Sequence, residues 1–118
     1  MRDHRKLRAF ELADQLALQV YQATKNFPRE EQFGLTSQMR RAAVSVASNI
    51  VEGCARSSQA DYVRFLDIVY SSAREIEYQL TLAFRLGYVS QEKVEQLEAT
   101  SNEASKVLAG LIRSLRKT

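Results

Sequence analysis

The chain has 118 residues, of which 45% are apolar and 26% charged, and its net charge is +3. This size and composition indicate one globular domain, and the mild net charge makes the distribution of charge more informative than its total. The single cysteine, Cys54, excludes an internal disulfide and suits a reducing cytoplasm.

The first expected helix covers about residues 8–26. Apolar or small side chains recur there at three- and four-residue spacings, which is the pattern of one buried helix face. They are Phe10, Ala13, Leu16, Ala17, Val20, Tyr21 and Thr24. Pro28 ends this helix, because the residue before a proline is disfavoured in the helical conformation. Gly34 then marks a turn before the next helix.

The second expected helix, residues 36–53, is apolar on two faces. Its core stripe contains Met39, Ala42, Ala43, Val46, Ile50 and Gly53. A second stripe of Val44, Ala47 and Val51 lies about 120° further round the helix. Thr36 or Ser37 is expected to cap the start, and Gly53 to end the helix in a left-handed conformation. A helix that is apolar on two sides is buried on two sides, so a second copy of the chain is expected to cover the second stripe.

Two longer helices follow, over about residues 58–86 and 90–116. Ser58 and Ser90 are the expected caps, and Gly87 ends the third helix. The inner stripe of the third helix is Tyr62, Phe65, Leu66, Val69, Ala73, Ile76, Leu80, Ala83 and Phe84. The fourth helix keeps a heptad-like spacing at Val94, Leu97, Ser101, Ala104, Leu108, Leu111 and Leu115. No strand pattern appears, and short links favour antiparallel neighbours. The predicted fold is therefore an all-α, up-down-up-down four-helix bundle.

This topology gathers positive charge at one end of the bundle. The start of the first helix, the link after the second and the end of the fourth are all expected there. They carry Arg2, Arg5, Lys6, Arg8, Arg56, Arg113, Arg116 and Lys117. Against Asp3, Glu52 and Asp61, these eight cations give a local charge of +5 and leave −2 for the rest of the chain.

The cations at the start of the first helix oppose its dipole. An anionic partner would explain them, and nucleic acid is the commonest such partner. The alternative is an ordinary basic tail, which is frequent in cytoplasmic proteins. No aromatic residue is interleaved with the cluster in sequence, so stacking on single-stranded bases finds no support.

Three charged residues on other faces also need partners. Arg41 and Glu75 lie away from the inner stripes and are predicted to pair, within one chain or between two, or else to form a solvated surface pair of little energetic weight. With Arg40, Val44, Ala47 and Val51 they make up the expected oligomer interface. Glu77 lies near the inner stripe of the third helix and needs a partner there, with Tyr21 or Arg40 as the candidates.

Catalysis, metals and membranes find no support in the sequence. His4 is the only histidine, and neither a Glu-x-x-His pair nor a phosphate-binding loop is present. Cys54 follows a helix end, so its thiolate gains nothing from the helix dipole. The charge-free runs at residues 15–24 and 42–51 are shorter than the ~18 residues of a membrane span. The basic amino terminus has no apolar core behind it, so no secretory signal is expected. The prediction is a cytoplasmic, non-enzymatic protein without a cofactor.

The chain resembles a known family in two long stretches. The first contains Phe27-Pro28, Glu31, Phe33-Gly34-Leu35-Thr36, Gln38, Arg40-Arg41-Ala42-Ala43, Ser45, Ser48-Asn49-Ile50, Glu52-Gly53 and Arg56. The second contains Phe65-Leu66, Ile68, Ser72, Glu75, Glu77, Gln79-Leu80 and Leu86-Gly87-Tyr88. This pattern resembles that of the small four-helix-bundle proteins encoded in intervening sequences of bacterial 23S ribosomal RNA genes.

The resemblance implies a homopentameric ring of bundles. Such a ring is similar to the barrel of the accessory proteins that work with reverse transcriptases in diversity-generating retroelements. The resemblance also implies nucleic-acid binding through a basic surface. The sequence departs from the family pattern at Ala47, Val51 and Ser71, where proline, alanine and glycine are frequent, and these changes affect helix bending and helix approach.

Two functions are therefore expected as alternatives. In the first, a homo-oligomer binds RNA or DNA through its basic end, and binding weakens steeply with salt because phosphate contacts release counterions. In the second, the assembly is a scaffold whose partners are only proteins. A variant that lacks the positive charges of Arg5, Lys6 and Arg8 separates the two, because only the first function then loses its binding.

Overall fold

The computed structural model describes residues 2–117 and contains four long helices. They are α1 (Arg8–Thr24), α2 (Leu35–Cys54), α3 (Gln59–Arg85) and α4 (Gln91–Arg116). Two short 3₁₀ helices, η1 (His4–Lys6) and η2 (Arg29–Glu31), precede α1 and α2. No strand occurs among the described residues. The expected all-α class and the four helices are confirmed, with boundaries that differ by one or two residues.

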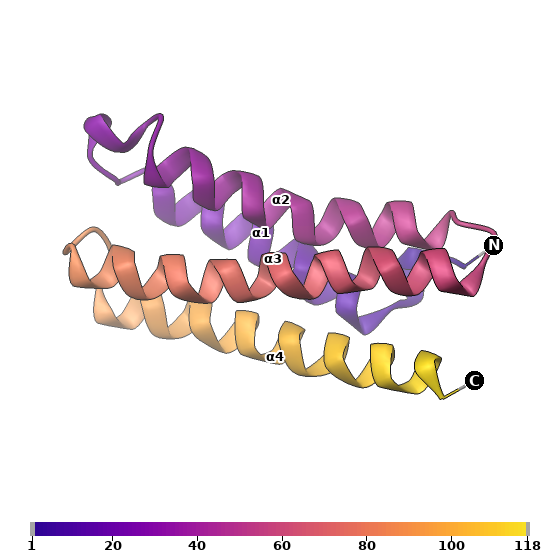
Figure 1. Cartoon of the computed structure of the whole chain (residues 1–118). Helices are drawn as coiled ribbons and strands as arrows, with labels where there is room; N and C mark the ends of the chain where they lie inside the picture. The colour runs from indigo at the N-terminus through magenta and orange to yellow at the C-terminus, as the bar shows by residue number, and fades with distance from the viewer. Residues whose placement is uncertain (1, 118) are drawn as a thin grey trace.

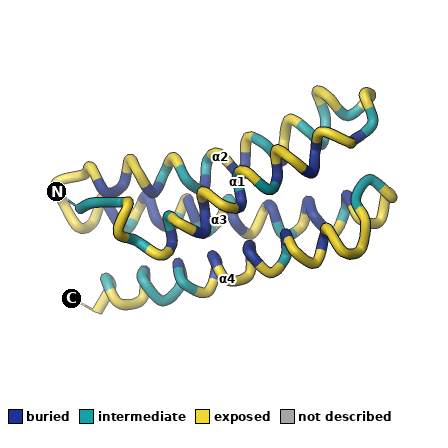
Figure 2. Tube along the Cα trace, turned by 180° about the vertical axis from the view of Figure 1, so that it is seen from behind, coloured by how far each residue is buried: buried dark blue, intermediate teal, exposed yellow. Residues whose placement is uncertain are grey.

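The helices lie side by side in an elongated body of 45 × 23 × 20 Å. α2 packs on α1 and α3, and α4 packs on the same two helices. Figure 1 shows each long helix returning alongside the one before it, so that both chain ends lie at the same end of the molecule. The buried positions of each helix form one stripe that faces the interior (Figure 2). No helix in residues 2–117 is long and apolar enough to cross a membrane.

The core stripes follow the predicted periodicity with few exceptions. All six predicted core residues of α2 are buried. So are the predicted core residues of α3 apart from Phe84, which is 42% exposed. In α1, Phe10 and Ala17 are half-buried, and Tyr21, like Phe84, is exposed, at 41%. Both rings lie at the edge of their stripes and border solvent.

Glu77 has partners other than those expected. Its carboxylate accepts a hydrogen bond from Ser105 Oγ at 3.1 Å and forms an ion pair with Arg74 Nη1 at 3.2 Å. The two candidates, Tyr21 and Arg40, instead contact each other, because the Arg40 guanidinium lies 4.6 Å from the centre of the Tyr21 ring. Glu77 faces α4, on the side of α3 opposite to that which packs on α2.

The predicted N-caps of α3 and α4 and the predicted end of α3 at Gly87 are confirmed, and the predicted N-cap of α2 is wrong. The Oγ atoms of Ser58 and Ser90 each accept a hydrogen bond from a backbone N–H of the first turn, and Gly87 ends α3 with φ +79°. Neither Thr36 nor Ser37 caps α2. Its first N–H, that of Leu35, donates to Glu31 Oε1 at 3.0 Å.

Glu31 also joins the two loops at the far end of the bundle. The hydroxyl of Tyr88 donates to Glu31 Oε2 at 2.8 Å. The pKa of Glu31 is lowered, mainly by the hydrogen bond from the Leu35 backbone and then by the one from the Tyr88 hydroxyl. The hydrogen bond to Glu31 raises the pKa of Tyr88 in turn. A charged carboxylate therefore holds the start of α2 against the turn between α3 and α4.

Gly53 does not end α2 in a left-handed conformation, as expected, because the helix continues to Cys54 and Ala55 follows with a right-handed φ of −82°. The glycine serves close packing instead. A Cβ atom built on Gly53 would lie 2.9 Å from Phe65 Cβ and 3.4 Å from Tyr62 Cδ1. The absence of a side chain lets α2 and α3 approach each other at the basic end.

Gly53→Ala is therefore expected to lower the free energy of unfolding by about 1 kcal/mol. Overpacking against an immobile Cβ costs about 1–3 kcal/mol, and this exceeds the ~1 kcal/mol that alanine gains over glycine inside a helix. Gly110→Ala is the matched control, because its nearest neighbour would be the Arg113 guanidinium at 4.0 Å. It should stabilise by about 0.5–1 kcal/mol. Urea midpoints that shift in the same direction for both variants would contradict this account.

Candidate nucleic-acid interface

The three basic segments meet at one end of the bundle, as the sequence predicts. Arg2 Nη1 donates to the backbone oxygen of Arg56 at 3.0 Å, which ties the amino terminus to the link between α2 and α3. Gln59 Nε2 donates to the backbone oxygen of Leu115 at 2.9 Å, which ties the start of α3 to the last turn of α4. In Figure 1 this is the end that carries both the N and C labels. We call it the basic end.

Several cations of the basic end are paired with carboxylates. Arg5 Nε lies 3.0 Å from Asp3 Oδ1, and the hydrogen bonds from Arg5 lower the pKa of Asp3. Arg8 pairs with Glu11 at 3.1 Å, which offsets the unfavourable position of this arginine in the first turn of α1.

The structure also changes the charge count of the basic end. It brings Arg64, Glu11 and Asp67 to this end, in addition to the residues that the sequence assigns there. Nine cations then face five carboxylates, which gives +4 instead of the predicted +5. The end is less basic than expected, and it still carries more positive charge than the whole chain.

Five cations of the basic end have no ion-pair partner within residues 2–117. They are Arg2, Lys6, Arg56, Arg113 and Lys117. Among these, Arg56 lies over the Phe65 ring, 4.7 Å from its centre. The side chains of Lys6, Arg113 and Lys117 are exposed and therefore available to an external anion.

Beneath these cations, the amino-terminal segment packs on a buried tyrosine of α3. The Arg2 guanidinium lies over the Tyr62 ring, 4.1 Å from its centre. Burial raises the pKa of Tyr62 to about 12, and burial also raises the pKa of the Cys54 thiol. Cys54 is thus a buried, protonated thiol, and Arg2 has a structural contact in addition to its charge.

His4 and the acidic side chains form no metal site in the described part of the chain. His4 packs edge-on against Phe10, with ring centres 4.7 Å apart. No group of three or more His, Cys, Asp or Glu side chains is placed to hold a metal ion among residues 2–117.

The residues predicted for an oligomer interface lie on two helices, with Glu75 on α3 and the others on α2. Arg40 Nε donates to Thr24 Oγ1 at 2.8 Å, so it faces α1. Arg41 contacts Gln38 on α2, and Glu75 accepts a hydrogen bond from Gln79 within α3. No ion pair joins Arg41 to Glu75 within residues 2–117, so their pairing between two chains stays a prediction.

The second apolar stripe of α2 lies open to solvent beside α1. Val44 and Val51 are 42% and 37% exposed, and Ala47 is half-buried. The hydrogen bond between Arg40 and Thr24 shows that the face of α2 that carries Val44, Ala47 and Val51 borders α1. We call the row formed by Phe10, Ala17, Tyr21, Val44, Ala47 and Val51 the α1–α2 seam.

The sequence missed one feature of this region. A hollow of about 400 Å³ between α3 and α4 is lined by Asp67, Tyr70, Ala109, Ile112, Arg113, Arg116 and Lys117. It places an aromatic ring beside the cations of the basic end, although Tyr70 is distant from them in sequence. Only the packing of α3 on α4 reveals this arrangement.

Comparison with known proteins gives one family and a solved structure. The family described as 23S rRNA-intervening sequence protein matches residues 5–110 of the chain. The crystal structure of a protein of unknown function from the S23 ribosomal protein family of Bacteroides thetaiotaomicron VPI-5482 is similar, with a TM-score of 0.79 and 28% sequence identity. The similarity covers 88% of this chain and 97% of that chain. No curated protein gives a significant match.

Proposed function

Since this chain belongs to the family of 23S rRNA-intervening sequence proteins, we propose that it is a non-enzymatic protein that binds RNA or DNA through its basic end. Its unit is an up-down-up-down bundle, and copies of this bundle assemble into a cyclic homo-oligomer, a pentamer by the family resemblance. The buried, unpaired Cys54 agrees with a reducing cytoplasm as the place where it acts.

One observation carries the proposal. The amino-terminal segment and the end of α4, which are far apart in sequence, converge so that Lys6, Arg113 and Lys117 stand exposed at the same end, without carboxylate partners among residues 2–117. Unpaired surface cations repel one another, and this repulsion is relieved when phosphates bind between them.

Assembly strengthens weak contacts at this end. Cyclic symmetry repeats the same surface at the same height around the axis, so the basic ends of all copies share one rim. A polyanion that contacts one copy then reaches the next at a high effective concentration. The exposed α1–α2 seam supports the assembly, because an apolar row of this length on a small bundle is a candidate contact surface.

The salt dependence of binding tests the proposal. A fluorescently labelled RNA and a DNA of equal length are titrated with the protein at several salt concentrations from about 50 to 200 mM. Binding should be tight at the low end, and the logarithm of the binding constant should fall linearly with the logarithm of salt concentration. Absence of binding to either polyanion at the lowest salt would reject nucleic-acid binding.

The rival function, a scaffold with protein partners only, gives a different result in the same preparation. A protein should then co-purify with the assembly, and nuclease treatment should leave the amount recovered unchanged. Nucleic acid that co-purifies and is lost with nuclease would instead favour the proposed function.

A further inference from the structure

A groove runs along the outside of the bundle between α3 and α4. It consists of three neighbouring hollows. The middle one, described above, shares Asp67 and Arg116 with a hollow nearer the basic end and shares Tyr70 and Ala109 with one nearer the middle of the bundle. Along α3 the lining extends from Gln59 to Glu77, which corresponds to about 27 Å at 1.5 Å per residue. The groove is therefore long enough for several nucleotides.

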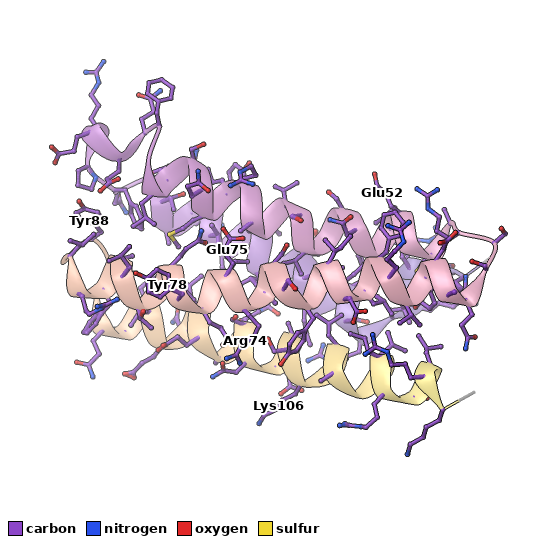
Figure 3. The ribbon with its side chains drawn as sticks, viewed as in Figure 1. Glu52, Arg74, Glu75, Tyr78, Tyr88 and Lys106 are labelled. Carbon is purple, nitrogen blue, oxygen red and sulfur yellow. The ribbon has the colours of Figure 1, made fainter. Side chains whose placement is uncertain are left out.

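The lining of this groove is strongly basic. Its cations are Arg64, Arg74, Lys106, Arg113, Arg116 and Lys117, and its carboxylates are Asp67 and Glu77, for a net charge of +4. Both carboxylates are already paired, Asp67 with Arg116 at 2.6 Å and Glu77 with Arg74 at 3.2 Å. Figure 3 shows Arg74 on α3 and Lys106 on α4 along this side of the bundle. The charge that remains uncompensated is positive, so the groove suits a polyanion.

Tyr70 gives the groove an aromatic surface beside these cations. The ring is half-buried and packs against the core, next to the buried Ile112 and the half-buried Ala109. Arg113 and Lys117, which have no ion-pair partner within residues 2–117, line the same hollow. An aromatic platform flanked by cations is the arrangement on which single-stranded nucleic acids bind, with bases stacked on the ring and phosphates beside the cations.

We propose that this groove binds a single-stranded segment of RNA or DNA, with one base stacked on Tyr70 and the backbone beside Lys106, Arg113 and Lys117. The proposal rests on the proposed function and adds the strandedness of the ligand. A duplex buries its bases between its strands and presents phosphates on a convex surface. It therefore contacts the exposed cations of the basic end and leaves Tyr70 and Lys106 uncovered.

The first test compares strandedness in matched variants. A labelled RNA oligomer is titrated alone and as a duplex with its complement, against wild-type protein, Tyr70→Leu and Tyr70→Phe. Tyr70→Leu should bind the single strand about tenfold more weakly and leave duplex binding unchanged, and Tyr70→Phe should bind like wild type. Tyr78→Leu is the control, because Tyr78 is a 60% exposed tyrosine of the same helix outside the groove (Figure 3). Equal losses for single strand and duplex would overturn the groove proposal.

The second test uses the charge of the groove away from the basic end. The salt slope is the slope of the logarithm of the binding constant against the logarithm of salt concentration. Lys106→Gln should reduce the size of this slope for the single strand by about 0.7, the value for one phosphate contact, and leave the slope for the duplex unchanged. Lys93→Gln, at the opposite end of α4, changes the charge equally and should alter neither slope. An unchanged single-strand slope in Lys106→Gln would contradict the proposed path of the backbone.

A third measurement needs no variant and so does not depend on how a mutant folds. Wild-type protein is irradiated with RNA that contains 4-thiouridine, and the adducts are located by mass spectrometry. The main adduct is expected on Tyr70, and adducts confined to other residues would overturn the proposal.

If single strand and duplex bind alike and no variant changes the binding, the groove proposal fails and the proposed function stands. If neither binds near 50 mM salt, the proposed function fails as well. Loss of a co-purifying protein in the groove variants, with RNA affinity unchanged, would make the groove a protein-docking surface and overturn the proposal.

Discussion

A glutamate in place of Ala47 is expected to convert the assembly into single bundles that keep their helices. Ala47 lies half-buried in the middle of the α1–α2 seam, between the exposed Val44 and Val51. In the proposed assembly this seam is desolvated, and an unpaired carboxylate buried there costs several kcal/mol at each contact. In a single bundle the same carboxylate reaches water, so the fold is unaffected. Light scattering after size-exclusion chromatography measures the mass, and circular dichroism measures the helical content.

Ala99→Glu is the matched control for this prediction. Ala99 is exposed on α4, away from α1 and α2, and the substitution adds the same side chain and charge. It should leave the mass of the assembly unchanged. Val44→Glu should behave like Ala47→Glu. If Ala47→Glu keeps the full mass of the assembly, or if the wild-type protein is itself a single bundle, the seam is not the contact between copies.

The fold was predictable from sequence because its main signals are local. The burial of Met39, Val46 and Ile50 follows from a 3.6-residue period. The caps at Ser58 and Ser90 are also local, because each serine accepts a hydrogen bond from the backbone N–H three residues further along the chain. Predictions failed where the deciding contact comes from outside the helix itself. The start of α2 is held by a carboxylate that also contacts Tyr88 in another loop, and Gly53 is required by Phe65 of the next helix. No periodic pattern in the sequence predicts either contact.

The candidate site was predictable only as a gathering of charge. Short links between long helices bring the chain ends and the α2–α3 link together, and this follows from topology. The partners of individual cations do not follow from it. The ion pair between Arg116 and Asp67, which joins α4 to α3, depends on the rotation of each helix about its axis. The same rotation places Tyr70 beside Arg113, so the α3–α4 groove becomes visible only in three dimensions.

Replacement of Lys6, Arg113 and Lys117 together by glutamine is expected to abolish most nucleic-acid binding without loss of assembly. These cations have no carboxylate partner within residues 2–117. In contrast, replacing Arg5 or Arg8 would also leave the carboxylate of Asp3 or Glu11 without its partner. The loss of a phosphate contact would then be mixed with the repulsion of phosphate by a free carboxylate. Each lost phosphate contact removes about 0.7 from the salt slope for single strands and about 0.9 for duplexes. The triple variant should therefore lose about 2–3 in slope and on the order of 100-fold in affinity near 50 mM salt.

The control places the same change of charge at the opposite end of the bundle. Lys25, Arg29 and Lys93 also have no ion-pair partner within residues 2–117, and they lie near the two loops far from the chain ends. Their triple replacement by glutamine lowers the net charge equally. If binding reflects only the total charge, both triple variants lose the same affinity and slope. If the basic end is the binding surface, the control keeps nearly all of its affinity, because screening over about 10 Å at 0.1 M salt confines the effect of each cation to its own end.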